Sequence, residues 1–379
     1  MPIRVMSWNI NRFSQATLDR QDYNEWYILE AITAQQLDIV LLIEVQSSGG
    51  LLGTLIGGNG AIGVRSLLAS LRAEDPASDW RLVPPPRLND NTLGQVYTEG
   101  LAVLYRHQML TFTGPNYYQG PGTVATGVAP GVPYVGNWAN ALPAGNYRAP
   151  RINWTNGNGH PLEWPNAGNR PPMMVTFTEN ANGRNIRFLA LHLPPDQARA
   201  ATALPRINSI PQLLGGMAAA DVAIAIGDIN YDPSKNTTMI AQHYYDLFTN
   251  PYHFRGFRAL NGVTRVEDTA LAGLGLSLGG RRRYQVVRAV NGRLTVNHLD
   301  NAYIKYGAPP PPGTNYNPTV VDMVAGTGPY ATTMALSIAG ITGQPYYNVD
   351  DLFREAQNYG HVARYDGVSD HLPIVVDVP

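Results

Sequence analysis

Short apolar runs separated by polar, turn-forming segments recur along almost the whole chain, and they limit its possible folds more than any other feature. Their length and flanking residues are typical of buried strands. We therefore predict strands at Ile3–Trp8, Asp38–Ile43, Gly100–Arg106, Met173–Thr178, Ile186–Leu191, Val222–Ile226, Leu299–Lys305 and Leu372–Val378.

Three other segments follow the spacing of a helix. The first lies between Tyr27 and Leu37, the second covers Ile62–Leu71, and the third covers Val349–Asn358, with Asn348 in the position of an N-cap. Strands with intervening helices predict an α/β or α+β architecture. Residues 114–172 and 307–345 show no clear period and are rich in Gly and Pro, so we interpret them as insertions or long loops.

The composition excludes several classes of protein. The net charge of −1 gives no overall basic field, so any contact with a polyanion must come from a local cluster. The absence of Cys excludes disulfides, thiolate catalysis and sulfur-based zinc sites. No apolar run is long enough to span a bilayer. Met1 runs straight into a strand and no signal peptide is visible, so we expect a cytoplasmic protein or a delivered effector. The oligomeric state stays open.

Polar residues stand at the ends of most predicted strands. The residues that follow a strand are Asn9, Glu44, His192, Asp228 and Asn230. The residues that precede one are Glu99, Asp300, Ser369, Asp370 and His371. Because the start of one antiparallel strand lies beside the end of its neighbour, we expect these groups to meet on one rim of the sheets.

Such a rim would present mainly oxygen atoms. Oxygen ligands suit Mg²⁺, Mn²⁺ or Ca²⁺, and not zinc. Each residue alone also has an ordinary explanation, since an Asp after a strand commonly caps its own turn. The joint pattern is what favours a metal site.

The motifs at these positions resemble those of the endonuclease/exonuclease/phosphatase superfamily, which has the fold of DNase I. The matching segments, in the family's order, are Met6–Asn11, Asp38–Val45, Leu189–His192, Ile226–Asn230, Leu299–Ala302 and Ser369–Pro373. Gly-Asp-Ile-Asn and Ser-Asp-His-Leu-Pro are the most specific of them. Since the segments run from near the first residue to near the last, we expect residues 1–379 to form one domain that contains the two insertions.

The resemblance implies a four-layer α/β sandwich, in which two packed mixed β-sheets are flanked by helices. The metal-site residues that it implies are Glu44, Asp370, Asn9 and Asp228. The catalytic histidines that it implies are His192, oriented by Glu99, and His371, oriented by Asp300. The residues that it implies for contact with the substrate phosphate or the water are Asp228, Asn230, Asn9 and Arg170.

His192 narrows the resemblance to certain branches. The abasic-site repair branch typically carries Tyr there, whereas the DNase I, cytolethal-distending-toxin, sphingomyelinase and inositol-phosphatase branches carry His. The pairing of Glu99 with His192 resembles DNase I most. Arg170 resembles the phosphate-binding arginine of the nuclease and toxin branches, with Arg148 or Arg151 as alternative equivalents.

These features together predict a Mg²⁺-dependent phosphodiesterase, with a DNA endonuclease as the leading activity. A phospholipid, phosphoinositide or nucleotide phosphatase would use the same chemistry, and the weak net charge keeps that alternative open. An inactive binding module is disfavoured, because degeneration usually removes clustered charges first.

Three further features keep two interpretations each. His298 could reach the site from the strand that carries Asp300, or simply pack on it. The run Arg281–Arg283 could contact a DNA backbone or form a solvated loop. The aromatic residues of 114–172 could stack on bases or hold an irregular loop together.

Overall fold

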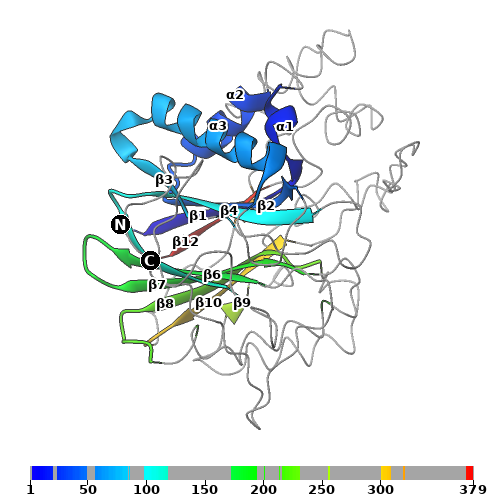
Figure 1. The fold of residues 1–379 in the computed structure, drawn as a ribbon. Helices are drawn as coiled ribbons and strands as arrows, with labels where there is room; N and C mark the ends of the chain where they lie inside the picture. Colours follow the sequence, from blue (N-terminus) through cyan, green and yellow to red (C-terminus); the bar gives the residue numbers. More distant parts are fainter. Residues whose placement is uncertain are drawn as a thin grey trace, which may run out of the picture.

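The computed structural model describes residues 2–19, 24–48, 56–83, 85, 98–117, 172–193, 200, 213, 216–230, 255–256, 300–308, 319–320 and 373–378. Two six-stranded mixed β-sheets pack face to face at its centre (Figure 1). The first sheet has the order β11 (Thr319–Val320), β12 (Ile374–Val378), β1 (Ile3–Phe13), β2 (Ile39–Ser47), β4 (Thr98–Arg106), β3 (Trp80–Val83). The second has the order β5 (Leu110–Tyr117), β6 (Met173–Glu179), β7 (Asn185–His192), β8 (Val222–Asp228), β10 (Asp300–Tyr306), β9 (Arg255–Gly256).

Each sheet has one parallel pair near its middle, β1–β2 in the first and β7–β8 in the second. All other pairings are antiparallel. The two strands of a parallel pair end at the same edge of their sheet. Each sheet therefore has an edge where the carboxyl ends of two buried strands meet.

The apolar runs place these strands in the core. Every residue of β8 is buried, and most of β1, β2 and β7 is buried too. Aromatic side chains connect the sheets: the ring of Tyr105 on β4 lies 5.1 Å from that of Phe177 on β6, measured between centroids. Such tilted aromatic pairs stabilise the packing of the sheets beyond the effect of the apolar area that they bury.

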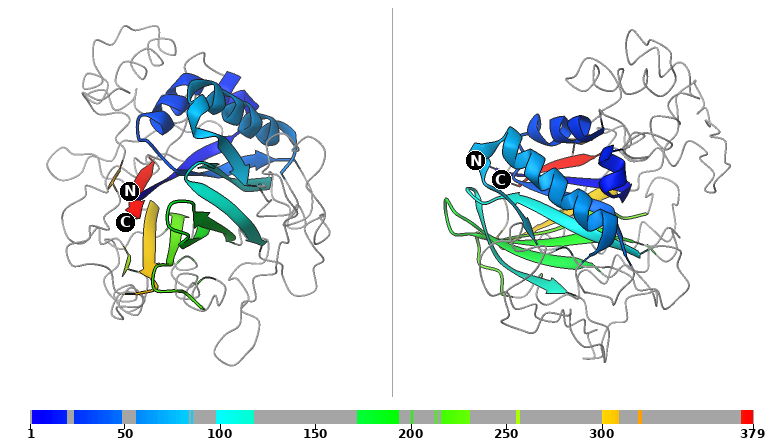
Figure 2. Two further views of the ribbon diagram at one scale, coloured as in Figure 1. Left: turned by 90° about the vertical axis from the view of Figure 1, so that its left-hand side faces the viewer. Right: turned by 45° about the horizontal axis from the view of Figure 1, so that its top comes forward.

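Three helices cover the outer face of the first sheet: α1 (Gln15–Asp19), α2 (Asn24–Thr33) and α3 (Gly58–Glu74) (Figures 1 and 2). The longest, α3, buries Val64, Leu67, Leu68 and Leu71, whose spacing places them on one face. A short 3-10 helix, Pro76–Ser78, leads into β3. No helix in the described part of the chain has both the length and the apolar character that a bilayer crossing requires.

The predicted fold class is confirmed, because two packed mixed sheets with helices outside are observed. Each of the eight predicted strands overlaps an observed one. The boundary of the first insertion was wrong: Gly114–Tyr117 belong to β5 and pair with Met173–Thr176. The second predicted insertion contains β11, which pairs with β12. The helix expected to reach Leu37 ends at Thr33, and the one at Val349–Asn358 lies outside the described residues.

Candidate active site

The carboxyl-end halves of the two parallel pairs face each other across the sandwich and carry the polar residues of the site. Asn9 lies on β1 and Glu44 on β2, while His192 and Asp228 are the last residues of β7 and β8. The side-chain amide of Asn9 donates to Asp228 Oδ2 at 2.9 Å and so joins the two sheets. Residues from four strands are thereby brought to one place.

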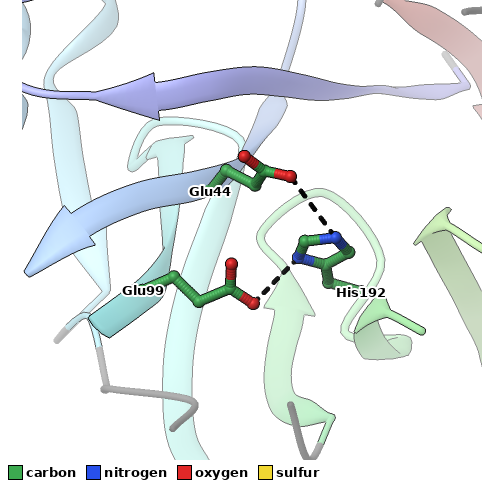
Figure 3. A group of neighbouring side chains, drawn as sticks. All are labelled: Glu44, Glu99 and His192. Atoms are coloured by element: carbon green, nitrogen blue, oxygen red, sulfur yellow. Dashed lines mark ion pairs between the residues drawn. The ribbon is translucent and has the colours of Figure 1, made fainter. Parts of the chain in front are cut away.

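The imidazole of His192 is held between carboxylates from the opposite sheet (Figure 3). Its Nδ1 lies 3.0 Å from Glu99 Oε1, and its Nε2 lies 3.6 Å from Glu44 Oε1. Asp228 Oδ2 also lies 3.6 Å from Nε2. The side chains of His192 and Glu99 are each 1% exposed, whereas that of Glu44 is 18% exposed. Nε2 therefore faces the more open side of the group, and Nδ1 faces the interior.

Asn9 links the two carboxylates that face Nε2. Its Nδ2 donates to Asp228 at 2.9 Å and to Glu44 Oε1 at 3.2 Å. Its Oδ1 accepts the backbone N–H of Asn11 at 3.1 Å, which fixes the amide orientation. In this arrangement Asn9 supports the carboxylates through its N–H groups, and its predicted role as a direct metal ligand stays a prediction.

The backbone around Glu44 is distorted. Glu44 has φ of +62°, in the left-handed region that non-glycine residues avoid. It belongs to a β-bulge, since β2 pairs with β4 at Leu42↔Ala102 and then at Val45↔Gly100. A left-handed non-glycine residue costs about 1–2 kcal/mol, and such strain is concentrated at functional sites. The bulge turns Glu44 out of the regular alternation and towards His192 (Figure 3).

The end of β8 is fixed by a compact set of hydrogen bonds. The Asp228 carbonyl accepts from the Leu193 N–H at 2.8 Å, and Asp228 Oδ1 accepts from the Asn230 N–H at 2.9 Å. The Asn230 amide in turn donates to the Leu193 carbonyl at 2.8 Å. The chain after His192 and the chain after Asp228 are thus tied together, which holds both side chains in position.

Asp300 extends the polar row across the second sheet. It is the first residue of β10 and pairs with Asp228, which in turn pairs with His192. Asp300 is 3% exposed. The structure therefore brings residues of six strands to one region, and they are six of the predicted site residues: Asn9, Glu44, Glu99, His192, Asp228 and Asp300. Asn230 follows directly after β8.

Asp370, His371 and Arg170 lie outside the described residues, as do His298 and Arg281–Arg283. Their predicted roles stay predictions. The backbone groups of Asn11 and Leu193 orient Asn9 and Asn230. Sequence reasoning missed them because nearly every residue carries the same backbone donor and acceptor.

The donor set fits a hard divalent cation. Oxygen atoms of Glu44 and Asp228 converge on the same nitrogens, Asn9 Nδ2 and His192 Nε2. Negative charge on both carboxylates would favour a cation beside them. Glu44, Glu99 and His192 also offer ligand atoms within 4.8 Å of one another. The 3.0 Å approach of Glu99 Oε1 to Nδ1 is better explained as a carboxylate–imidazole contact that orients the ring. Glu44 belongs to that group, and Asp228 approaches the same nitrogen of His192. The metal-site role predicted for these two carboxylates stays a prediction.

Comparisons with known proteins match the fold but not the sequence. No protein-family model matches the chain, and no curated protein does. Among solved structures, SmcL superposes with a TM-score of 0.50 at 12% identity, over 100% of this chain and 99% of SmcL. The chain therefore shares with SmcL the fold described above, in which two mixed β-sheets pack face to face.

Two further structures are similar at lower scores. The catalytic domain of human Nocturnin has a TM-score of 0.47 at 14% identity, covering 99% of this chain and 92% of that one. An endonuclease/exonuclease/phosphatase from Bacteroides vulgatus has a TM-score of 0.45 at 12% identity, covering 100% and 98%. At such identities the likeness concerns the fold alone, so the activity must be argued from the site.

Proposed function

We propose that the chain is a divalent-metal-dependent phosphodiesterase, and that its leading activity is endonucleolytic hydrolysis of DNA. One observation carries the proposal. A buried imidazole has one nitrogen fixed by a carboxylate, while the other faces two carboxylates that could hold a cation. Phosphodiester hydrolysis needs this combination, because proton transfer and compensation of the phosphate charge must occur at one point.

Different residues would carry out the proton transfer, hold the carboxylates and bind the phosphate. Glu99 fixes the orientation of His192, so that Nε2 can take a proton from water or give one to the leaving oxygen. Asn9 holds Glu44 and Asp228 in place. A bound Mg²⁺ would supply the positive charge that offsets the charge developing on the phosphate oxygens. The predicted partners are Asp370 at the metal site, His371 as the second proton-transfer group, and Asn230 and Arg170 at the phosphate.

Two classes of substrate fit this chemistry. The resemblance of the Glu99–His192 pair to DNase I favours DNA. The net charge of −1 provides no general attraction for a polyanion, which keeps a phospholipid, phosphoinositide or nucleotide substrate open. An inactive binding module is the least favoured alternative, since the described carboxylates and His192 retain a coherent arrangement.

Nicking of supercoiled plasmid tests the activity directly. We expect nicking in Mg²⁺, its loss in EDTA, and a loss of at least about 10²-fold in His192→Ala, which is the typical contribution of one proton-transfer group. A plasmid left intact by the wild-type protein, together with hydrolysis of sphingomyelin or an inositol phosphate, would transfer the proposal to the second substrate class. Near-wild-type nicking by His192→Ala would remove His192 from the mechanism.

Metal binding can be tested without any substrate. A ligand that binds only the folded state raises the thermal midpoint. We expect Mg²⁺ to raise the midpoint of the wild-type protein and to raise that of Glu44→Gln far less, because the variant loses one charged ligand. Glu74→Gln is the matched control, since Glu74 is exposed near the end of α3 and should keep the full response. An equal response in Glu44→Gln would exclude Glu44 as a ligand.

A further inference from the structure

The segment of β1 beside Glu44 departs from strand geometry and includes a positively charged side chain. β1 pairs with β2 at Asn9↔Ile43 and next at Phe13↔Val45, so residues 10–12 lie opposite Glu44 alone. Asn11 and Arg12 both have left-handed backbones, with φ of +47° and +58°. Two consecutive non-glycine residues adopt this conformation only when the surrounding structure imposes it.

The structure imposes it from both sides. On one side, the N–H of Asn11 is bound to the Asn9 side chain, which also holds the site carboxylates. On the other side, Phe13 is completely buried, and α3 leaves no space beside Ser14, where even a Cβ on Gly63 would lie 2.5 Å from the backbone. The backbone of Arg12 is thus fixed relative to the site, while the residue itself is exposed.

The charge of Arg12 is opposite to that of the carboxylates at the site. The ionisable side chains that the structure brings together at the site are carboxylates from Glu44, Glu99, Asp228 and Asp300, besides His192. A substrate with several phosphates would be repelled there beyond the single phosphate that a cation compensates. Arg4 lies near the opposite end of the same strand, roughly 20 Å or more away at the rise of a β-strand. Of the two arginines of β1, Arg12 is therefore the one near Asn9 and the candidate site.

We propose that Arg12 binds a phosphate adjacent to the scissile one, so that the substrate is a chain of phosphodiesters and not a molecule with a single phosphate. This inference rests on the proposed phosphodiesterase function. A guanidinium binds two phosphate oxygens at once, which suits the recognition of a backbone. Its fixed main chain lowers the entropy lost on binding. Arg12 acts on substrate affinity, while His192 and the carboxylates act on the bond that breaks.

Kinetics with two substrates test the assignment on the full chain in Mg²⁺. For a duplex oligonucleotide, we expect Arg12→Ala to raise KM about tenfold, as for the loss of one charge-assisted hydrogen bond, with little change in kcat. For bis(p-nitrophenyl) phosphate, which has one phosphate, KM should stay unchanged. The slope of log KM against log salt for the oligonucleotide should fall by about one, the effect of losing one phosphate contact. An equal effect on both substrates, or no effect on either, would overturn the proposal.

Three matched variants distinguish the effect of the Arg12 charge from the effect of the strained backbone at that position. Arg12→Lys should recover part of the affinity. Arg12→Gly accepts a left-handed backbone without strain, so it should fold and behave like Arg12→Ala. Arg4→Ala removes an arginine from the other end of β1, where it pairs with Asp377, and should leave both KM values unchanged. Wild-type affinity for the oligonucleotide in Arg12→Gly would contradict the proposal.

Binding in EDTA distinguishes this inference from the proposed function. If the wild-type protein hydrolyses neither substrate, the phosphodiesterase proposal fails on its own. Fluorescence anisotropy with the labelled oligonucleotide then decides on Arg12. Tighter binding by the wild-type protein than by Arg12→Ala supports the contact, whereas equal binding or no binding by the wild-type protein refutes it.

Discussion

Glu99 is a carboxylate with no exposed surface, in contact with one nitrogen of His192. Burying a carboxylate is costly unless a partner compensates for the lost water. The imidazole is that partner, and the contact fixes which ring nitrogen faces the site. At the scale of single residues, Glu99 is therefore a positioning residue that acts through His192.

Replacing Glu99 by Gln should lower kcat about 10- to 100-fold, the usual effect of losing a group that orients a catalytic imidazole. KM should change little, because Glu99 does not reach the substrate in the proposed mechanism. Steady-state kinetics on the proposed substrate measure this split.

Glu179→Gln is the control for Glu99→Gln. Glu179 is also a buried carboxylate, but it pairs with Arg184 in the turn between β6 and β7. Its replacement should lower stability and leave the kcat of the folded protein unchanged. Equal kcat values in the two variants would show that Glu99 matters only for folding.

At the scale of elements, the close approach of β7 and β8 positions the two residues that end them. Gly227 has φ of +150°, and a Cβ there would lie 1.9 Å from the carbonyl oxygen of Leu191. That oxygen belongs to the backbone of the adjacent parallel strand and cannot rotate away. Only glycine therefore lets His192 and Asp228 lie side by side.

Gly227→Ala should accordingly reduce the free energy of unfolding by more than about 4 kcal/mol, in the range reserved for severe backbone conflicts. Gly183→Ala is the matched control. Its φ of +74° is also left-handed, but nothing lies within 4 Å of the added Cβ, so it should cost only about 1 kcal/mol. Urea unfolding curves measure the loss of unfolding free energy in both variants. Equal losses would mean that β7 and β8 can separate at that point without penalty.

The sequence predicts the interiors of these elements better than their ends. Apolar runs locate the buried parts of β1, β2, β7 and β8, because burial on both faces requires them. The same pattern places Asn9 and Glu44 at strand ends, whereas both strands continue through bulges to Phe13 and Ser47. A bulge depends on the pairing with a neighbouring strand, and an apolar pattern carries no information about it.

β5 shows a second limit. It contains Gly114 and Pro115, which mark a loop in most sequences. In the structure β5 is the edge strand of its sheet, where a missing N–H and a bulge are tolerated. The position of a strand at the edge of a sheet depends on tertiary structure and cannot be inferred from local sequence. The Gly and Pro residues of this segment therefore predict an insertion. The residues of the site, by contrast, were recognisable because several strand-end polar residues occur together.

At the scale of the whole molecule, the sandwich depends on aromatic packing between the sheets. Tyr105 lies 5.1 Å from Phe177 and 6.3 Å from Phe112, measured between ring centroids. Phe177 pairs with Ile186, near the start of β7, while His192 is at its end. This cluster and the site are thus at opposite ends of the sandwich.

Phe177→Ala should reduce the free energy of unfolding by about 3–5 kcal/mol through the cavity that it leaves. The kcat measured well below the unfolding midpoint should be unchanged, because the site is roughly 20 Å away along β7. Phe177→Leu should lose clearly less stability. A fall in kcat without a fall in stability would mean that the packing of the sheets adjusts the site directly.

The site draws on both sheets, from Asn9 on β1 to Asp300 on β10, and this has a consequence for synthesis on the ribosome. A nascent chain that has completed β1, β2 and β4 carries Asn9, Glu44 and Glu99, but neither His192 nor the acids of the second sheet. The proposed hydrolysis would therefore begin only after the residues of the second sheet have emerged. Products of premature termination before residue 192 lack His192, and we expect them to have none of the proposed activity.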